Sequence, residues 1–235
     1  SARDADHGRE LWGSEETGPD ARLVKDVSPG PISSDGYPVQ SLNGQLVLLA
    51  MDETHGRELW LSDGTDGGTV LLKDIYPGVL GSFVSDVVVF NNQLGFQAGD
   101  GTHGRELWIS DGTTGGTVLL ADINPGTSNS DPEAFVAMGG YLYFKANDGV
   151  NGTELWRTDG TPGGTSLVID INPGTSSSLT SYEIVTNGSL LFLTAQDSSS
   201  NGYELWVSDG TSAGTSQIDI RPGSLSSAPS DKTVI

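Results

Sequence analysis

The sequence contains no cysteine, which excludes disulfide bonds and thiol chemistry. No apolar run approaches the roughly 18 residues that suggest a membrane-spanning helix, so we predict no membrane insertion. The first residues, from Ser1 on, do not resemble a signal peptide. Basic residues are few: 11 Lys and Arg stand against 31 Asp and Glu, for a formal net charge of −20. This balance argues against nucleic acid and anionic membranes as partners, and it permits cations and neutral sugars.

Tryptophan is scarce, but its five copies are evenly placed. Trp12, Trp60, Trp108, Trp156 and Trp206 are separated by 48, 48, 48 and 50 residues. A period of this size indicates tandem units, each of which buries its apolar faces against its neighbours. A chain of 235 residues with 35% hydrophobic residues can form one core of that kind. We therefore predict a single repeat domain over residues 1–235.

Each Trp stands in the first strand of a predicted β-hairpin, and the clearest copy covers residues 106–126. Residues 106–110 (ELWIS) and 117–123 (TVLLADI) have the aromatic and β-branched content of strands. The segment between them, DGTTGG, is typical of a turn, because Asp bonds its own backbone and Gly adopts positive φ. The second strand ends at a Pro-Gly pair.

A second hairpin recurs between these units. Its clearest copy covers residues 133–146 around Gly139-Gly140, and the counterparts are residues 37–50, 86–98 and 182–195. Each period thus holds four short strands, several of them apolar on both faces, and no helical apolar stripe. Four-stranded units covered on both faces are typical of β-propeller blades. A solenoid of stacked sheets is the alternative.

Alignment of the copies predicts how the ring would close. Ser1 aligns with Leu49 and Ile235 with Phe90, so the stretch between the two ends corresponds to residues 91–96. Adding that stretch gives a whole number of repeats. We therefore predict an all-β, five-bladed β-propeller of four-stranded antiparallel blades, its ring closed by a composite blade from both termini.

The repeated motif Glu-Leu-Trp-x-x-Asp-Gly-Thr-x-x-Gly-Thr is found at residues 58–69, 106–117 and 154–165, and residues 204–215 fit it as well. It resembles the bacterial ELWxxDGT tandem-repeat family. The first copy departs from the pattern, since residues 12–19 lack the Asp-Gly pair. The resemblance implies an extracellular or cell-surface bacterial protein and supplies no biochemical activity.

The tryptophans have two interpretations. Alternation places Trp108 on one strand face with Glu106 and Ser110, and both faces of a propeller blade contact neighbours. We therefore expect the tryptophans to pack between blades. Exposed platforms for sugar binding are the alternative.

Carboxylates recur in the connection that precedes each Trp strand. An Asp, a turn with Gly and a Glu provide hard oxygen ligands of the kind that Ca²⁺ takes. The candidate calcium ligands are Asp52, Glu58, Asp100, Glu106, Asp148, Asn151 and Glu154. In the alternative, Asp caps the turn by accepting N–H bonds and Glu pairs with a nearby Arg such as Arg105.

Histidine recurs at equivalent places, His7, His55 and His103, and is replaced by Asn151 and Asn201 in the other copies. Replacement by Asn favours a role in the turn over a zinc site.

The segments after Pro-Gly are polar and differ between copies, which makes them the candidate ligand-binding loops. The candidate residues are Thr127, Ser128, Asn129, Ser130, Thr175, Ser176 and Ser177.

The sequence shows no nucleophile elbow, phosphate loop or metalloprotease motif, and residues copied five times serve the repeat rather than one active site. We therefore predict a protein that is not an enzyme. The first hypothesis is a multivalent recognition module for cell-surface or extracellular glycans. The second is a structural or adhesion module that contacts other surface proteins and is stabilised by calcium. A glycosidase built on the acidic loops is a distant third.

Overall fold

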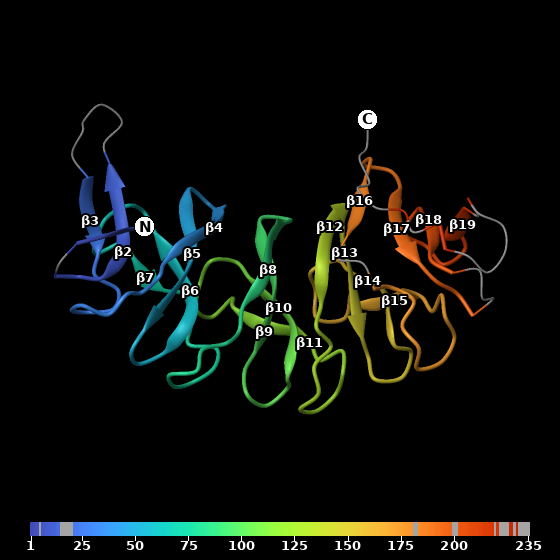
Figure 1. The fold of residues 1–235 in the computed structure, drawn as a ribbon, viewed down its shortest axis with the longest axis horizontal. Coiled ribbons are helices and arrows are strands. Elements are labelled where there is room, and N and C mark those ends of the chain that lie inside the picture. The colour runs from blue at the N-terminus through green and yellow to red at the C-terminus, as the bar shows by residue number, and fades with distance from the viewer. Residues whose placement is uncertain are drawn as a thin grey trace. The chain divides into compact units, whose positions relative to one another are not determined.

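The structure is a computed structural model, and it describes residues 1–4, 6–14, 21–180, 183–198, 202–218, 220, 226–227 and 229. All regular elements of the described residues are β-strands, in agreement with the predicted all-β class (Figure 1). The first three are β1 (Ala2–Arg3), β2 (Arg9–Ser14) and β3 (Ala21–Lys25). The next four are β4 (Tyr37–Leu42), β5 (Gln45–Asp52), β6 (Gly56–Ser62) and β7 (Val70–Leu71).

The later strands repeat this arrangement. They comprise β8 (Ser85–Phe90), β9 (Gln93–Gly99), β10 (Arg105–Ser110) and β11 (Val118–Ala121). Then come β12 (Glu133–Met138), β13 (Tyr141–Asn147), β14 (Thr153–Thr158) and β15 (Ser166–Ile169). The last are β16 (Ile184–Thr186), β17 (Leu191–Ala195), β18 (Glu204–Ser208) and β19 (Ser216–Ile218).

Strands that follow one another in the chain are neighbours in the same sheet. The described residues form one three-stranded sheet, β1–β3, and four four-stranded sheets, β4–β7, β8–β11, β12–β15 and β16–β19. This β-propeller-like meander is what two hairpins per period predict. In the first sheet β1 is a two-residue stub, as the alignment predicts for the N-terminus. The segment 232–235 that we expect to close the ring lies outside the described residues, and so do residues 15–19 of the divergent first copy.

The chain divides into two compact units, residues 1–102 with 108–118, and residues 103–107 with 119–235. In the first unit, sheets β1–β3 and β4–β7 pack against each other through Leu11 and Val24 on one side and Leu48 and Trp60 on the other. Trp60 is 6% exposed. The predicted role of the tryptophan in packing between sheets is therefore confirmed for Trp60.

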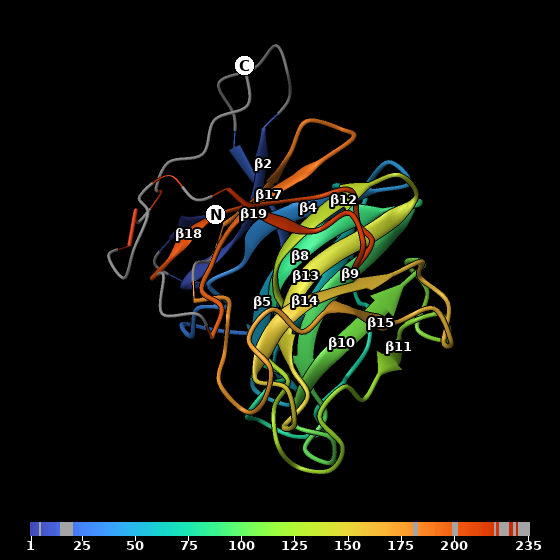
Figure 2. The ribbon, with the colours of Figure 1, turned by 90° about the vertical axis from the view of Figure 1, so that its right-hand side faces the viewer.

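In the second unit, sheets β12–β15 and β16–β19 share a core. Met138, Tyr143 and Leu155 pack there with Leu193 and Trp206. Figure 2 shows β13 and β14 side by side in the first of these sheets. The two strands are antiparallel, and Lys145 pairs with Leu155 in their register. Trp206 is 8% exposed, so this tryptophan too is a packing residue.

The structure shows the predicted turn contacts in the hairpin that carries the Trp. In the copy at residues 110–117, Oδ1 of Asp111 accepts the N–H of Thr113 (2.8 Å) and its hydroxyl (2.7 Å), while Gly112 takes φ 91°. The hydroxyls of Ser110 and Thr117 lie 2.7 Å apart and join the two strands. No helix of the described residues has the length and the apolar character needed to cross a membrane.

Candidate functional site

The Glu that precedes Leu-Trp is fully buried in every repeat. Glu10, Glu58, Glu106, Glu154 and Glu204 are each 0% exposed. Their carboxylates receive hydrogen bonds from the connection that leaves the last strand of the sheet, here called the connection loop: residues 26–34, 74–82, 122–130 and 170–178 in the first four copies. Each carboxylate with its donors is here called a glutamate clamp.

The clamp of Glu106 shows the geometry. The N–H of Ile123 donates to Oε2 (2.7 Å) and the N–H of Ser130 donates to Oε1 (2.9 Å). The hydroxyl of Ser130 donates to Oε2 as well (2.6 Å). The carboxylate therefore holds the two ends of the connection loop, and three donors occupy its two oxygens.

The same clamp forms in the other copies. Glu154 accepts from the N–H groups of Ile171 (2.9 Å) and Ser178 (3.0 Å), and Glu10 accepts from the N–H of Ser34 (2.8 Å). At Glu58 the hydroxyl of Ser82 donates to Oε2 (2.6 Å). Burial raises the pKa of Glu58, Glu106 and Glu154 to about 7, and the negative charge of a neighbouring Asp adds to this effect.

The Asp at the start of the preceding turn has a separate task. Oδ1 of Asp52 accepts the N–H groups of Thr54 (2.9 Å) and His55 (2.6 Å), and Oδ2 lies 2.7 Å from Nδ1 of His55. In another copy Nδ2 of Asn151 donates to Oδ2 of Asp148 (2.7 Å). His and Asn thus make the same bond, which confirms the predicted turn role. The hydrogen bond to Asp52 raises the pKa of His55.

These contacts bear on the candidate calcium ligands. Asp52, Asp100 and Asp148 cap turns, since Asp100 likewise accepts the N–H of Thr102 (2.7 Å), whereas the glutamates bind the connection loop. In the part of the chain that the structure describes, no group of three or more His, Asp or Glu side chains could hold a metal ion. The alternative prediction, that Glu106 pairs with Arg105, is wrong, because Nε of Arg105 instead donates to Oδ1 of Asp131 (2.7 Å).

The candidate ligand-binding residues divide into two groups. Thr127, Ser128, Thr175 and Ser176 are exposed at the outer bend of their connection loops. Asn129 and Ser177 support the loop, because Oδ1 of Asn129 accepts the N–H of Arg105 and Oγ of Ser177 accepts the N–H of Thr153, each at 2.9 Å. Ser130 is 1% exposed and belongs to the clamp of Glu106, so its side chain is closed to a ligand.

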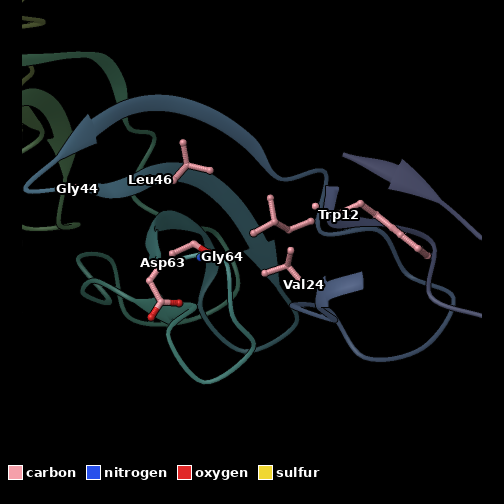
Figure 3. A pocket seen from close by; sticks show the side chains of 9 residues that line it. Trp12, Val24, Gly44, Leu46, Asp63 and Gly64 are labelled. Carbon is pink, nitrogen blue, oxygen red and sulfur yellow. The ribbon is translucent and has the colours of Figure 1, made fainter. Parts of the chain in front are cut away.

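A pocket of about 300 Å³ lies between sheets β1–β3 and β4–β7 (Figure 3). Its lining residues are Leu11, Trp12, Gly13, Val24, Gly44, Leu46, Ser62, Asp63 and Gly64. Gly13 stands where the other copies carry Leu61, Ile109, Arg157 and Val207. In Figure 3 the ring of Trp12 extends away from Leu46, and the Asp63 carboxylate is bound by Thr65 in its own turn, so the pocket offers mainly apolar surface.

No family model matches the chain, and no curated protein matches it. Among solved structures, a puromycin hydrolase is similar over 86% of this chain and 30% of its own, with a TM-score of 0.55 at 16% identity. A prolyl endopeptidase structure is similar over 90% of this chain and 30% of its own, with a TM-score of 0.52 at 12% identity. An α-L-arabinofuranosidase from Clostridium thermocellum covers 79% of this chain and 72% of its own, with a TM-score of 0.38 at 18% identity.

At these identities the first two likenesses show the fold alone, and a TM-score of 0.38 carries no argument. The chain spans about a third of the length of the puromycin hydrolase and prolyl endopeptidase structures.

Proposed function

We propose that the chain is a non-enzymatic recognition module whose connection loops bind neutral glycans. The observation that carries the proposal is the division of labour inside these loops. Their two ends are fixed by a buried Glu, while the residues between are exposed. Thr127 and Ser128 recur as Thr175 and Ser176, whereas the first two copies carry Pro31-Ile32 and Val79-Leu80 at the same positions. Variable side chains on a fixed backbone are the arrangement of a binding loop.

The exposed groups suit an uncharged, hydroxyl-rich ligand. Thr and Ser hydroxyls both donate and accept hydrogen bonds, as sugar hydroxyls do. The net charge of −20 opposes anionic ligands. Single loops of this kind bind weakly, and several equivalent loops in one chain gain affinity by acting together.

The residues common to the repeats support the absence of catalysis. Five of them have structural contacts: Trp60 and Trp206 pack, Glu106 clamps, and Asp52 and Asp111 cap turns. None of these side chains is left for acid–base or nucleophilic work in these contacts.

A glycan array, screened with and without Ca²⁺, tests the proposal. We expect the wild-type chain to bind neutral glycans, and a variant with Thr127, Ser128, Thr175 and Ser176 all changed to Ala to lose that binding. Ser41→Ala, at an exposed position on β4, is the matched control and should bind as the wild type does. Binding by the fourfold variant at the wild-type level, or no binding by the wild type, would contradict it.

A structural or adhesion module is the second candidate, because the shared Trp, Glu and Asp residues described above make contacts within the fold. This candidate predicts that a calcium chelator lowers the melting temperature and that glycans leave it unchanged. An unchanged melting temperature in chelator would remove calcium from the account.

The finer architecture belongs to the same proposal: five blades in a closed ring, in a secreted or cell-surface protein of the ELWxxDGT repeat family. The repeat supports it, since five copies account for the described sheets. Small-angle scattering of the 235-residue chain separates a compact ring from an elongated solenoid.

A further inference from the structure

The connection loop of residues 74–82 exposes more large apolar side chains than the other described connection loops. In the loop of residues 74–82 and just after it, Val79 is 68% exposed, Leu80 64% and Phe83 55%. These three residues are here called the apolar patch. The ring of Tyr76 packs edge-on against Phe83, with ring centroids 6.3 Å apart. Exposed large apolar side chains gathered in one place mark an interaction surface.

The backbone of Phe83 has a positive φ, which the Asp residues at the equivalent positions of two other copies tolerate better. It takes φ 55°, and the residues that follow the clamped Ser in two other copies, Asp35 and Asp131, take φ 46° and 47°. Asp tolerates this left-handed region, whereas a bulky residue there is strained. Strain of this kind is typical of functional positions, so its presence at an exposed Phe points to a role outside the fold.

The same replacement removes an ion pair. Nε of Arg105 lies 2.7 Å from Oδ1 of Asp131, and Nε of Arg9 lies 3.9 Å from Oδ1 of Asp35. Arg57 is the equivalent arginine beside Phe83. Among the described residues its guanidinium makes one hydrogen bond, from Nη1 to the carbonyl oxygen of Asp35 at 3.5 Å, and no ion pair.

We propose that the apolar patch and Arg57 bind an apolar segment of another protein that carries a carboxylate next to its apolar side chains. Val79, Leu80 and Phe83 supply the apolar contact, and the guanidinium of Arg57 supplies donors in a geometry that fits a carboxylate. Aromatic residues and Arg are the side chains that dominate protein interfaces.

Charge and chemistry disfavour other occupants. A second copy of this chain would bring a net charge of −20, far more than the single carboxylate that Arg57 can pair, so self-association is opposed. A glycan offers hydroxyls, which two aliphatic side chains cannot bond. The patch therefore acts independently of glycan binding by the polar loops.

An array of ten-residue peptides tests the assignment. Each peptide carries a Leu and a Phe, flanked by Glu, by Gln or by Lys. We expect the wild-type chain to bind the Glu-flanked peptides about 10-fold more tightly than the Gln-flanked ones. Arg57→Gln should bind the two sets equally, and Val79→Thr with Leu80→Ser should lose binding to both by about 10-fold or more.

Phe83→Asp separates binding from folding, because Asp is the residue of two other copies, as Asp35 and Asp131, and can pair with Arg57. We expect this variant to melt at or above the wild-type temperature and to lose peptide binding. Ile32→Thr, at an exposed apolar position of the first connection loop, is the matched control and should bind as the wild type does.

Three results overturn the proposal. The first is equal peptide binding by the wild type and Phe83→Asp, and the second is equal binding of Glu- and Lys-flanked peptides. The third is sedimentation of the wild type as a dimer and of Phe83→Asp as a monomer, which would make the patch a self-association surface.

Discussion

The glutamate clamp makes the sharpest prediction for Glu106→Gln. The substitution keeps the shape of the side chain and replaces one carboxylate oxygen with an NH₂ group. In the wild type the N–H groups of Ile123 and Ser130 bond to opposite oxygens of Glu106 (2.7 and 2.9 Å). In the variant the amide nitrogen therefore faces one of these two N–H groups, whichever way the amide is oriented. A protonated Glu106 still has lone pairs on both oxygens, so Gln does not imitate it.

The magnitude follows from the donors. One buried N–H left without an acceptor costs about 1–3 kcal/mol, and the remaining bonds lose their ionic character for about 1 kcal/mol more. We therefore expect Glu106→Gln to lower the free energy of opening the connection loop by about 2–4 kcal/mol.

Native-state hydrogen exchange measures this loss at the residues concerned. The amides of Ile123 and Ser130 should exchange about 30-fold faster or more, since each 1.4 kcal/mol is a factor of ten. Ile171 and Ser178, held by the next clamp, are the control within the same molecule and should keep their rates. Unchanged exchange at Ile123 and Ser130 would refute the clamp.

The pH dependence gives an independent readout of the same groups. Burial raises the pKa of Glu58, Glu106 and Glu154 from 4.5 to about 7. A raised folded-state pKa means that their contribution to stability is complete below pH 4.5 and is lost as the pH rises to 7. The slope is at most about 1.4 kcal/mol per pH unit for each group.

Urea unfolding between pH 4.5 and 7.5 tests this dependence. Stability should fall across that range, and less steeply in Glu106→Gln, which has one titrating clamp fewer. Carboxylates with lowered pKa, such as Asp111, oppose the trend only below about pH 4, so they do not mask it. A stability that stays constant or rises across the range would contradict it.

Two further substitutions test the turns. A Cβ on Gly116 would lie 2.1 Å from Oδ1 of Asp111, so Gly116→Ala should lower the free energy of unfolding by about 1–3 kcal/mol in urea unfolding. A Cβ on Gly115 would have nothing within 4 Å, so Gly115→Ala should change it by no more than about 0.5 kcal/mol. Equal effects of the two substitutions would refute the turn geometry. His55→Asn should keep the hydrogen bond to Asp52 but remove the group that titrates. The raised pKa of His55 contributes stability that is present below pH 6.5 and is lost as the pH rises, and this contribution should disappear in the variant. An unchanged pH dependence of stability above pH 6.5 would count against this role of His55.

The sequence was sufficient for the fold class and for much of the repeat. The period of Trp12 to Trp206 and the two turn signals per period predict four strands, because these signals act between residues close in the chain. Trp60 and Trp206 pack between sheets because strand alternation and the need to cover both faces leave little choice.

The glutamate clamp could not be inferred from local pattern. The donors to Glu106 are backbone N–H groups 17 and 24 residues further on, and backbone groups carry no sequence signature. One signal did exist: a Ser stands 24 residues after Glu10, Glu58, Glu106 and Glu154. In the last three of these copies its hydroxyl donates to the carboxylate of the clamp. Because this partner is so distant in the chain, the local pattern predicts Ser130 as a ligand-binding residue, whereas the structure buries it in the clamp.

The apolar patch illustrates the opposite case. The third and fourth copies carry polar residues where this copy has Val79 and Leu80. An apolar residue in a loop is nevertheless as compatible with burial as with exposure. The structure distinguishes the two, because Val79, Leu80 and Phe83 are all more than half exposed.

The central claim is that buried residues of the repeat fix the connection loops and that the exposed residues between them bind ligand. Chemical-shift mapping of the amide groups during titration with a neutral glycan from the array tests it most directly. The account predicts shifts at residues 127–129 and 175–177 and none at Ile123 or Ile171 within the clamps. Shifts confined to the strands, or no shifts at saturating glycan, would contradict it.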